Sequence, residues 1–511
     1  MTHWVILPVL LPLIGGLLQL LARGFGLPAQ RVLGLFLAGG LVASGIKILT
    51  LAQTGDTLVY NLGNWPAPFG IVLALDRLAA MMVLLTSVLA LGALGYSNVM
   101  RIDEKGSHFH VLFQLQLFGL NGAFLTGDVF NLFVFFEVLL LASYGLLLHG
   151  SGAGRTRAGL HYVVINLIGS TLFLFAVGAL YGAVGTLNIA DMAQKVAAAP
   201  AARSGLIAAA GLLLLVVFAL KAAMFPLYLW LPQAYANTSA PVAAFFAIMT
   251  KVGVYAIIRV HGTVFGELAG DLAWVHMPWV LAGGLVTLVL AALGVMAARG
   301  LREQVAYLVL ASVATLLVAV GLNRPEALAA GLYYLLHSTL LAGAFFLLAD
   351  LIRRSRGAAS DRFDRVARMQ GGRWLGIAYF FAAVALAGLP PMSGFIGKIM
   401  ILDAALAHPW RWIVLACTLT ASLLILVALV RSGSFLFFRP QEMASEENVP
   451  LGESPKKPAL WIIGSMLLTA PLLVLFAGEL MKFTDVTATQ LQNVPKYIEA
   501  VLENPLTGEE R

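Results

Sequence analysis

The sequence predicts an all-α polytopic membrane protein with about fourteen transmembrane helices. Of its 511 residues, 60% are hydrophobic and only 11% are charged, and the mean hydropathy is +0.90. This composition excludes a water-soluble globular domain of the same size. Apolar runs of about 20 residues, long enough to cross the hydrocarbon core as helices, recur from the first residues nearly to the last. A closed β-barrel is excluded as well, because alternating strands would keep the hydropathy low.

Each expected span is one such apolar run. The first, MTHWVILPVLLPLIGG, lacks the basic leader and cleavage site of a secretory signal, so we interpret it as a retained helix. The fourteen spans are expected at roughly 4–22, 32–52, 73–95, 108–126, 129–149, 160–184, 205–240, 242–260, 277–298, 303–321, 327–350, 374–406, 411–436 and 458–482.

The distribution of basic residues predicts which way the spans run. Loops after odd-numbered spans carry nineteen Lys and Arg residues, and loops after even-numbered spans carry six. Cytoplasmic loops of membrane proteins are enriched in Lys and Arg, so the odd-numbered loops are expected in the cytoplasm and both termini outside. The net charge of +7 therefore reflects sidedness, and no nucleic-acid partner is expected.

Two spans contain prolines where a continuous helix needs backbone donors. Pro226 and Pro232 interrupt span 7, and Pro390 and Pro391, followed by Gly394, interrupt span 12. The two broken spans are five apart, which predicts an inverted repeat with spans 4 to 8 in one copy and spans 9 to 13 in the other. Paired discontinuous helices in inverted repeats are typical of secondary transporters. The alternative is that the prolines are tolerated kinks.

This repeat divides the chain. We expect an N-terminal three-helix region (1–107), a first repeat (108–260), a second repeat (277–436), a cytoplasmic linker (437–457), a last span (458–482) and a polar tail (483–511). The tail is expected to contain a short amphipathic docking helix through Ile498, Val501 and Leu502.

Five ionisable residues lie deep within spans and predict a proton or ion path. They are Glu137, Lys221, Lys251, His337 and Lys398. A charged side chain at mid-bilayer costs roughly 2.5 to 3.5 kcal/mol, so these groups must face protein or water. Lys221 is the natural partner of Glu137, and separating the pair would release a proton from the lysine. The alternative for each residue is a purely structural role in helix packing.

Other chemistry has no visible centre in the sequence. Asp403 is a possible outer mouth of the path, and Asp76 and Asp128 are expected to be solvated at span ends. The single Cys417 cannot form an intrachain disulfide, and no His or Cys cluster has metal-ligand spacing. We therefore expect no metal, no cofactor and no enzymatic site.

Three long motifs resemble a known family. The segments GDVFNLFVFFEVLLLASYGLL, FALKAAMFPLYLWLPQAYANTSAPVAAFFAIMTKVGVY and LAGLPPMSGFIGK are similar to the antiporter-like subunits shared by respiratory complex I and Mrp-type cation/proton antiporters. Nearly the whole chain is covered. The segments FNLFVFFE and YLLHSTLLAGAFFLLADLI most resemble the D-type subunits of the multisubunit Mrp (Pha or Mnh) antiporters of bacteria.

The resemblance implies roles for the residues of the path. Glu137 and Lys221 correspond to the functional pair of a first half channel, Lys251 to a linking residue and Lys398 to the terminal residue of a second. Many relatives carry a lysine five residues after the histidine that matches His337, whereas this chain has Ala342.

The family also implies partners and a location. These are other Mrp subunits, especially the large A-type subunit together with the small ones, as well as protons, Na+ or K+ and membrane lipid, in the bacterial inner membrane. Two alternatives remain: a proton-pumping subunit of complex I or a membrane-bound hydrogenase, and a standalone solute carrier with its substrate site at the broken helices.

Overall fold

The fold is a bundle of membrane-length helices. A computed structural model describes residues 3–65, 67–364, 369–438 and 452–502. In these ranges twelve helical segments are long and apolar enough to cross a membrane, and two shorter apolar helices, Phe109–Leu125 and Gly372–Ala387, lie within predicted spans 4 and 12. The predicted all-α membrane class is confirmed. The inverted repeat, the total number of spans and the domain limits stay predictions.

The helices up to the first interruption are α1 (Leu7–Ala22), α2 (Leu27–Ala52), α3 (Arg77–Val99), α4 (Phe109–Leu125), α5 (Val129–Leu148), α6 (Ala153–Val184), α7 (Ile189–Ala197) and α8 (Ala201–Lys221). The remaining helices are α9 (Trp230–Asn237), α10 (Ala240–Phe246), α11 (Met249–Ala256), α12 (Gly262–Val264), α13 (Met277–Ala297), α14 (Leu301–Gly321), α15 (Pro325–Ser355), α16 (Gly372–Ala387), α17 (Ser393–Ala405), α18 (Arg411–Phe437), α20 (Lys457–Leu467), α21 (Thr469–Leu475), α22 (Ala477–Gln492) and α23 (Val494–Leu502).

Short turns join several of these helices. They are the 3₁₀ turns η1 (Arg23–Phe25), η2 (Leu62–Asn64), η3 (Asp103–Lys105), η5 (Glu267–Leu272) and η6 (Gly357–Ala359), and the π-helical turn η4 (Ile257–His261) between α11 and α12.

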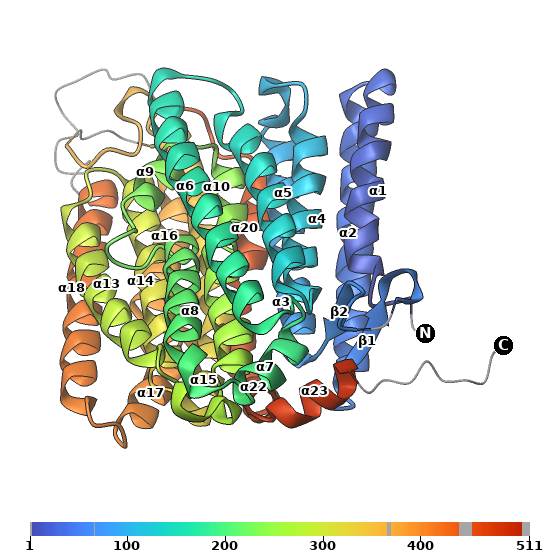
Figure 1. Cartoon of the computed structure of the whole chain (residues 1–511). Coiled ribbons are helices and arrows are strands. Elements are labelled where there is room, and N and C mark those ends of the chain that lie inside the picture. Colours follow the sequence, from blue (N-terminus) through green and yellow to red (C-terminus); the bar gives the residue numbers. More distant parts are fainter. Residues whose placement is uncertain (1–2, 66, 365–368, 439–451, 503–511) are drawn as a thin grey trace.

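The core of the bundle lies at α10 to α12, α14 and α15, whose side chains are almost all buried. In Figure 1, α1 and α2 stand on the right-hand side of the bundle, and α13 and α18 stand on the left-hand side. These peripheral helices expose large apolar side chains such as Phe36 and Leu423. Such an exposed apolar surface is what lipid or a partner protein would cover.

A β-hairpin replaces the beginning of predicted span 3. Strand β1 (Leu58–Asn61) pairs antiparallel with β2 (Val72–Leu75), with Leu58 opposite Leu75. The expectation of a helix from residue 73 was wrong, because Asp76 sets the helix start: its carboxylate accepts a hydrogen bond from the Ala79 amide at 2.9 Å and so caps α3.

Both predicted helix interruptions are present. Helix α8 ends at Lys221 and α9 begins at Trp230, with Pro226 between them; α16 ends at Ala387 and α17 begins at Ser393. Pro390 and Pro391 fill the second gap. Pro232 was wrongly placed among the breaks. It lies in the first turn of α9, where a helix needs no backbone donor from it.

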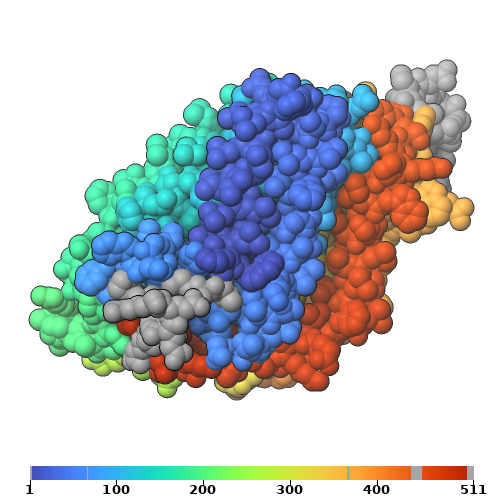
Figure 2. Space-filling view, turned by 90° about the vertical axis from the view of Figure 1, so that its right-hand side faces the viewer, coloured from blue at the N-terminus to red at the C-terminus, as the bar shows by residue number. Residues whose placement is uncertain are grey.

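The C-terminal part departs from one straight span. Helix α20 gives way to α21 at Leu468, because Pro471 inside α21 cannot donate to the preceding turn. Helix α22 continues to Gln492, ten residues beyond the predicted end at 482. Figure 2 shows the last helices (orange-red) beside the blue helices of the N-terminal region. Most of the predicted linker (439–451) and the end of the tail (503–511) lie outside the described residues.

The predicted amphipathic helix of the tail is confirmed as α23. Its Val494, Ile498 and Val501 are buried, and it packs against α7 and β1. Helix α1 begins and α23 ends at the same end of the bundle as the hairpin (Figure 1). The sidedness of the termini stays a prediction.

Candidate functional site

The five ionisable residues predicted as a path lie on five helical segments through the middle of the bundle. Glu137 is on α5, Lys221 ends α8, Lys251 is on α11, His337 is on α15 and Lys398 is on α17. The side chains of Lys221, Lys251, His337 and Lys398 are all at least nine-tenths buried. Buried ionisable groups require polar partners, so their surroundings decide what they can do.

Lys221 and Glu137 are joined through α6 and not to each other. The Lys221 Nζ donates to Asn166 Oδ1 at 3.0 Å, and Ser170, one turn further along α6, donates through its hydroxyl to Glu137 Oε1. Among the described residues no ion pair of 4.0 Å or less connects Glu137 with Lys221, although Glu137 lies close enough to act on Lys221 electrostatically. The partnership of the two residues stays a prediction. The long helix α6 places two neutral side chains where the sequence suggested a carboxylate.

Glu137 is also less buried than expected. It is half-buried, and the neighbouring α5 positions Val134 and Leu141 are exposed. Residues three and four apart share one helix face. Glu137 therefore borders an outward-facing apolar stripe of α5, where lipid or another subunit would contact it.

The central lysine is enclosed completely. Lys251 is 0% exposed, and its Nζ donates to the Ser312 hydroxyl on α14 at 3.0 Å. Between Lys221 and this helix lies a cavity of about 20 Å³, lined by Asn166, Lys221 and Val252 among others. A cavity of this size accommodates on the order of one water molecule.

The second helix interruption surrounds Lys398 and His337. The Lys398 Nζ donates to the Ala387 carbonyl, the last residue of α16, at 2.9 Å and to the Ser422 hydroxyl at 3.2 Å. The ammonium thus caps the carbonyl end of α16, where a helix dipole favours a cation. His337 Nδ1 lies 2.7 Å from the hydroxyl of Ser393, the first residue of α17.

Small residues and a small cavity complete this region. A methyl group added to Gly394 would lie only 2.5 Å from His337 Nε2, so a glycine is required at that position. A cavity of about 10 Å³ lies between Ser312 and Lys398 and is also lined by Thr315 and Tyr334. Because Ser312 holds Lys251, this cavity links the central lysine with the second interruption.

Two further sequence predictions are placed by the structure. Asp403 is exposed in the last turn of α17, five residues beyond Lys398, as a mouth residue would be. Ala342 is buried on α15, so the position where relatives carry a lysine is here filled by a methyl group.

The partners of the lysines could not be found from the sequence. Asn166, Ser312 and Ser422 stand in apolar runs with no charge or spacing that marks them. A polar residue within a span is the only signal they give, and dozens of hydroxyl-bearing residues share it. Their role follows only from the packing of one helix against another.

The two aspartates that were expected to be solvated at span ends are buried instead. Asp76 forms an ion pair of 2.6 Å with Arg259. Asp128, which caps α5, is 9% exposed, and burial raises the pKa of its carboxyl to about 6.

Comparison with known proteins identifies the family and the relatives that this chain resembles. The family described as "NADH:quinone oxidoreductase/Mrp antiporter, TM" matches residues 126–424. The chain is 41% identical to the D-type subunit of a probable K(+)/H(+) antiporter of Rhizobium meliloti, covering 99% of this chain and 98% of the relative. It is 36% identical to the D-type subunit of a Na(+)/H(+) antiporter of Bacillus subtilis, covering 98% and 100%.

Solved structures agree. A chain of the Mrp complex from Dietzia sp. DQ12-45-1b superimposes with a TM-score of 0.85 at 26% identity, over 98% of this chain and 100% of that chain. A chain of an archaeal membrane-bound sulfane sulfur reductase gives a TM-score of 0.88 at 22% identity, over 98% and 99%, which shows a shared fold.

Proposed function

Because the chain belongs to the NADH:quinone oxidoreductase/Mrp antiporter family, we propose that it is the proton-translocating D-type subunit of a heteromeric Na+(K+)/H+ antiporter. It is a transporter component rather than an enzyme. The observation that carries the proposal is the row of buried Lys221, Lys251 and Lys398, each held by neutral groups beside small cavities.

The hydrogen bonds of the lysines support proton transfer. A lysine ammonium has three donors, whereas Lys221 and Lys251 each have one acceptor in the structure and Lys398 has two. In the described part of the chain no carboxylate pairs with any of the three. Since no salt bridge fixes them as cations, water in the adjoining cavities can take up and deliver their protons.

In this proposal Glu137 controls the protonation of Lys221, the first lysine of the row. It lies close enough to act on Lys221 electrostatically and is attached to the same helix, α6, through Ser170. A negative charge at Glu137 favours the ammonium form of Lys221, and moving or neutralising that charge favours proton release. His337, beside Ser393, continues the path toward Lys398 without the lysine that relatives carry at the position of Ala342.

The half-buried position of Glu137 supports assembly with other subunits. The exposed face of α5 beside Glu137 is apolar, and a neighbouring subunit there would bury the carboxylate and could alter its charge. We assign this role to the large A-type subunit together with the small subunits of the complex, with lipid covering the remaining apolar surface.

Location and ion follow from the same reasoning. We place the chain in the bacterial inner membrane with both termini outside, since Lys and Arg are concentrated in the opposite loops. The relatives' names contain both K+ and Na+, so either cation is a candidate substrate of the complex.

The test uses the complete gene cluster in an antiporter-deficient strain. Everted vesicles containing a pH-gradient dye are challenged with Na+ or K+, and the wild type is compared with Lys251→Ala. We expect cation-dependent dequenching from the cluster and its loss in the variant. Lys47→Ala is the matched control, because Lys47 is an exposed lysine within a span.

The same assay separates the alternatives. Antiport by this chain expressed alone would support a standalone carrier and contradict a role that depends on the other subunits. NADH-driven acidification by the cluster without any cation response would support the complex I alternative instead.

A further inference from the structure

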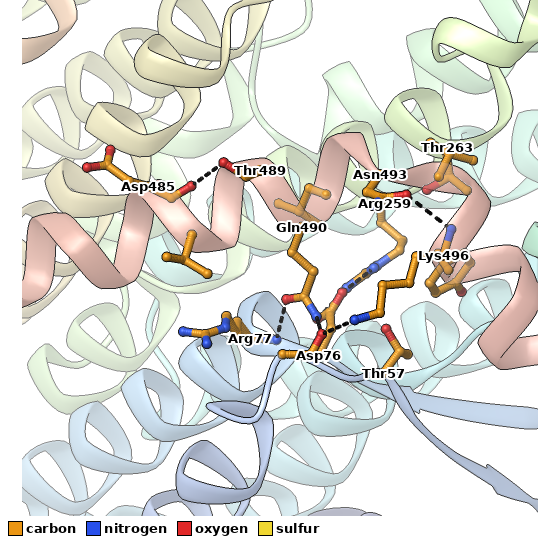
Figure 3. A pocket seen from close by; sticks show the side chains of 15 residues that line it. Thr57, Asp76, Arg77, Arg259, Thr263, Asp485, Thr489, Gln490, Asn493 and Lys496 are labelled. Atoms are coloured by element: carbon orange, nitrogen blue, oxygen red, sulfur yellow. Dashed lines mark hydrogen bonds and ion pairs between the residues drawn. The ribbon is translucent and has the colours of Figure 1, made fainter.

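A cavity whose walls include several charged side chains lies at the end of the bundle that carries the hairpin and α23. Its volume is about 340 Å³, and its walls come from the chain before β1, the start of α3, the end of α22 and α23. Figure 3 shows α22 and α23 passing over the hairpin, with Gln490 reaching toward Arg77. Lys496 bonds the chain before β1 through Asp56. By the distribution of basic residues, this end of the protein faces the outside.

The inner wall of the cavity is a buried ion pair. Arg259 Nη1 lies 2.6 Å from Asp76 Oδ2, and the two side chains are 4% and 3% exposed. The Arg259 guanidinium is held between two aromatic rings, with ring centres at 5.4 Å for Tyr255 and 5.7 Å for Tyr497. Tyr497 belongs to α23, so the C-terminal helix covers the arginine.

Two residues of this wall follow the central lysine along the same helical segment. Lys251, Tyr255 and Arg259 follow one another at four-residue spacing along α11 and η4, and Arg259 Nε donates to Tyr255 Oη at 3.1 Å. The helix widens to a π turn at Arg259. Such turns occur frequently at functional sites.

The charges of the cavity do not fit a strong anion or lipid-headgroup site. Arg259 is paired with Asp76, and Lys496 is paired with Asp56 at 3.0 Å. Asp485 adds a further carboxylate to the lining. Two of the three cations in the lining are therefore already paired with carboxylates of this chain, and the third, Arg77, donates to the Gln53 carbonyl. Phosphate sites instead present unpaired Arg or Lys.

One polar atom at the inner wall lacks a partner. The Tyr497 hydroxyl, on a side chain that is 7% exposed, has no hydrogen-bond partner in the structure. A buried hydroxyl without a partner is costly. It offers a position where a water molecule could be held next to Arg259.

Resting on the function proposed above, we propose that this cavity is an outer vestibule of the proton path and that the Arg259–Asp76 ion pair is the gate between the vestibule and Lys251. Protons would reach or leave the central lysine through Tyr255 and water when Arg259 moves away from Asp76. A positive charge on Lys251 would repel Arg259 along the same helix, so arrival of a proton would favour opening.

The first experiment blocks the vestibule. In the complete complex carrying Cys417→Ala, Thr57→Cys places a thiol in the cavity wall, and Glu267→Cys places one on an exposed residue of the same side outside the cavity. Intact cells are treated with a membrane-impermeant trimethylammonium methanethiosulfonate. Everted vesicles are then prepared and assayed for antiport.

The cavity proposal requires a selective effect. We expect at least about fivefold loss of antiport after modification at Thr57→Cys, no loss at Glu267→Cys, and recovery after reduction with dithiothreitol. Full antiport with a complete adduct at Thr57→Cys, or no adduct there, would overturn the proposal. Displacement of bound phospholipid with unchanged antiport would identify a lipid site instead.

The second experiment opens the gate. Asp76→Asn removes one charge of the ion pair, and we expect the passive proton leak of vesicles without added Na+ or K+ to rise several-fold. Asp56→Asn is the matched control, because it breaks the exposed pair with Lys496 at the same cavity. An unchanged leak in Asp76→Asn at normal abundance would contradict the gate.

These outcomes are separable from the function itself. If the unmodified complex exchanges no cation for protons, the proposed function fails. If antiport is present but insensitive to modification at Thr57→Cys, only the vestibule fails.

Discussion

The two helix interruptions hold their lysines differently. At the first, Lys221 is the last residue of α8 and donates to an amide on α6. At the second, Lys398 lies beyond the gap on α17 and reaches back to the Ala387 carbonyl of α16. A carboxylate, Glu137, acts on the first lysine, whereas a histidine, His337, accompanies the second.

This difference separates an adjustable site from a fixed one. The surroundings of Lys221 depend on a side-chain charge that borders an exposed face of α5, where another subunit can contact it. The surroundings of Lys398 depend on a backbone carbonyl, whose partial charge cannot be titrated. Contacts with other subunits should therefore change the protonation of Lys221 at the first interruption and leave Lys398 at the second unaffected.

The largest effect is expected from removing either lysine. Lys221→Ala and Lys398→Ala should each lower antiport at least about tenfold, because each ends the row of protonatable groups. Dye dequenching in everted vesicles measures the loss, and immunoblotting confirms membrane abundance. Lys482→Ala, in an exposed pair with Glu479, should have no effect. If only one lysine proved essential, the two interruptions would not act in series.

Neutralising Glu137 should come next. Glu137→Gln can still accept from Ser170 but loses the charge that acts on Lys221, so we expect roughly three- to tenfold lower antiport, equal to about 1 kcal/mol in the barrier. Glu137→Asp keeps the charge and should retain more activity than the glutamine variant in the same assay. Equal activity of the two variants would show that the charge is not used.

The neutral partners of the lysines provide a finer comparison. Asn166→Leu removes the single acceptor of Lys221, whereas Ser422→Ala leaves Lys398 with the Ala387 carbonyl. Leaving a buried donor unpaired costs about 1–3 kcal/mol. We expect several-fold lower antiport for Asn166→Leu and less than about twofold for Ser422→Ala, measured in parallel. The reverse order would show that the backbone carbonyl does not hold Lys398.

The smallest effect concerns stability at the start of α5. The pKa of Asp128 is raised to about 6, from roughly 3.9 in the unfolded chain. The folded state therefore binds more protons, and its stability should fall as the pH rises from about 4 to about 6.

Asp128→Asn tests that prediction. Asparagine caps a helix as well as aspartate does. At pH 7.5 the free energy of unfolding of the variant should therefore exceed that of wild type by on the order of 1–3 kcal/mol, which raises its melting temperature. At pH 4 the two proteins should differ little. Asp271→Asn, at an exposed position, is the control. A variant that melts like wild type at both pH values would contradict the buried state of this carboxyl.

Hydropathy predicted the membrane fold because length and apolarity alone decide whether a segment can span. The lysines were visible for the same reason, since charges in apolar runs stand out. The acceptor of Lys221, Asn166 on α6, was not predicted because charge attraction to Glu137 was considered without the geometry of that helix. The hairpin was missed because residues 72–75, VLAL, are all apolar, and apolarity alone does not distinguish a short strand from the start of a helix.

Arg259 was missed because it lies at the end of the predicted span 242–260, where a long cationic side chain ordinarily reaches interfacial water. Only the packing of Asp76 and Tyr497 against it reveals a buried ion pair. The functional role of the row, the domain limits and the inverted repeat stay predictions that mutation and assembly experiments must test.

Helix α23 is the last described segment to leave the ribosome, yet it covers Arg259 at the outer end of the bundle. The membrane-embedded helices can thus be inserted while their outer opening is still uncovered. We expect a product truncated before Val494 to insert but to dissipate the proton gradient of its host. Synthesis of α23 would then be the step that closes the outer opening and prevents proton leakage.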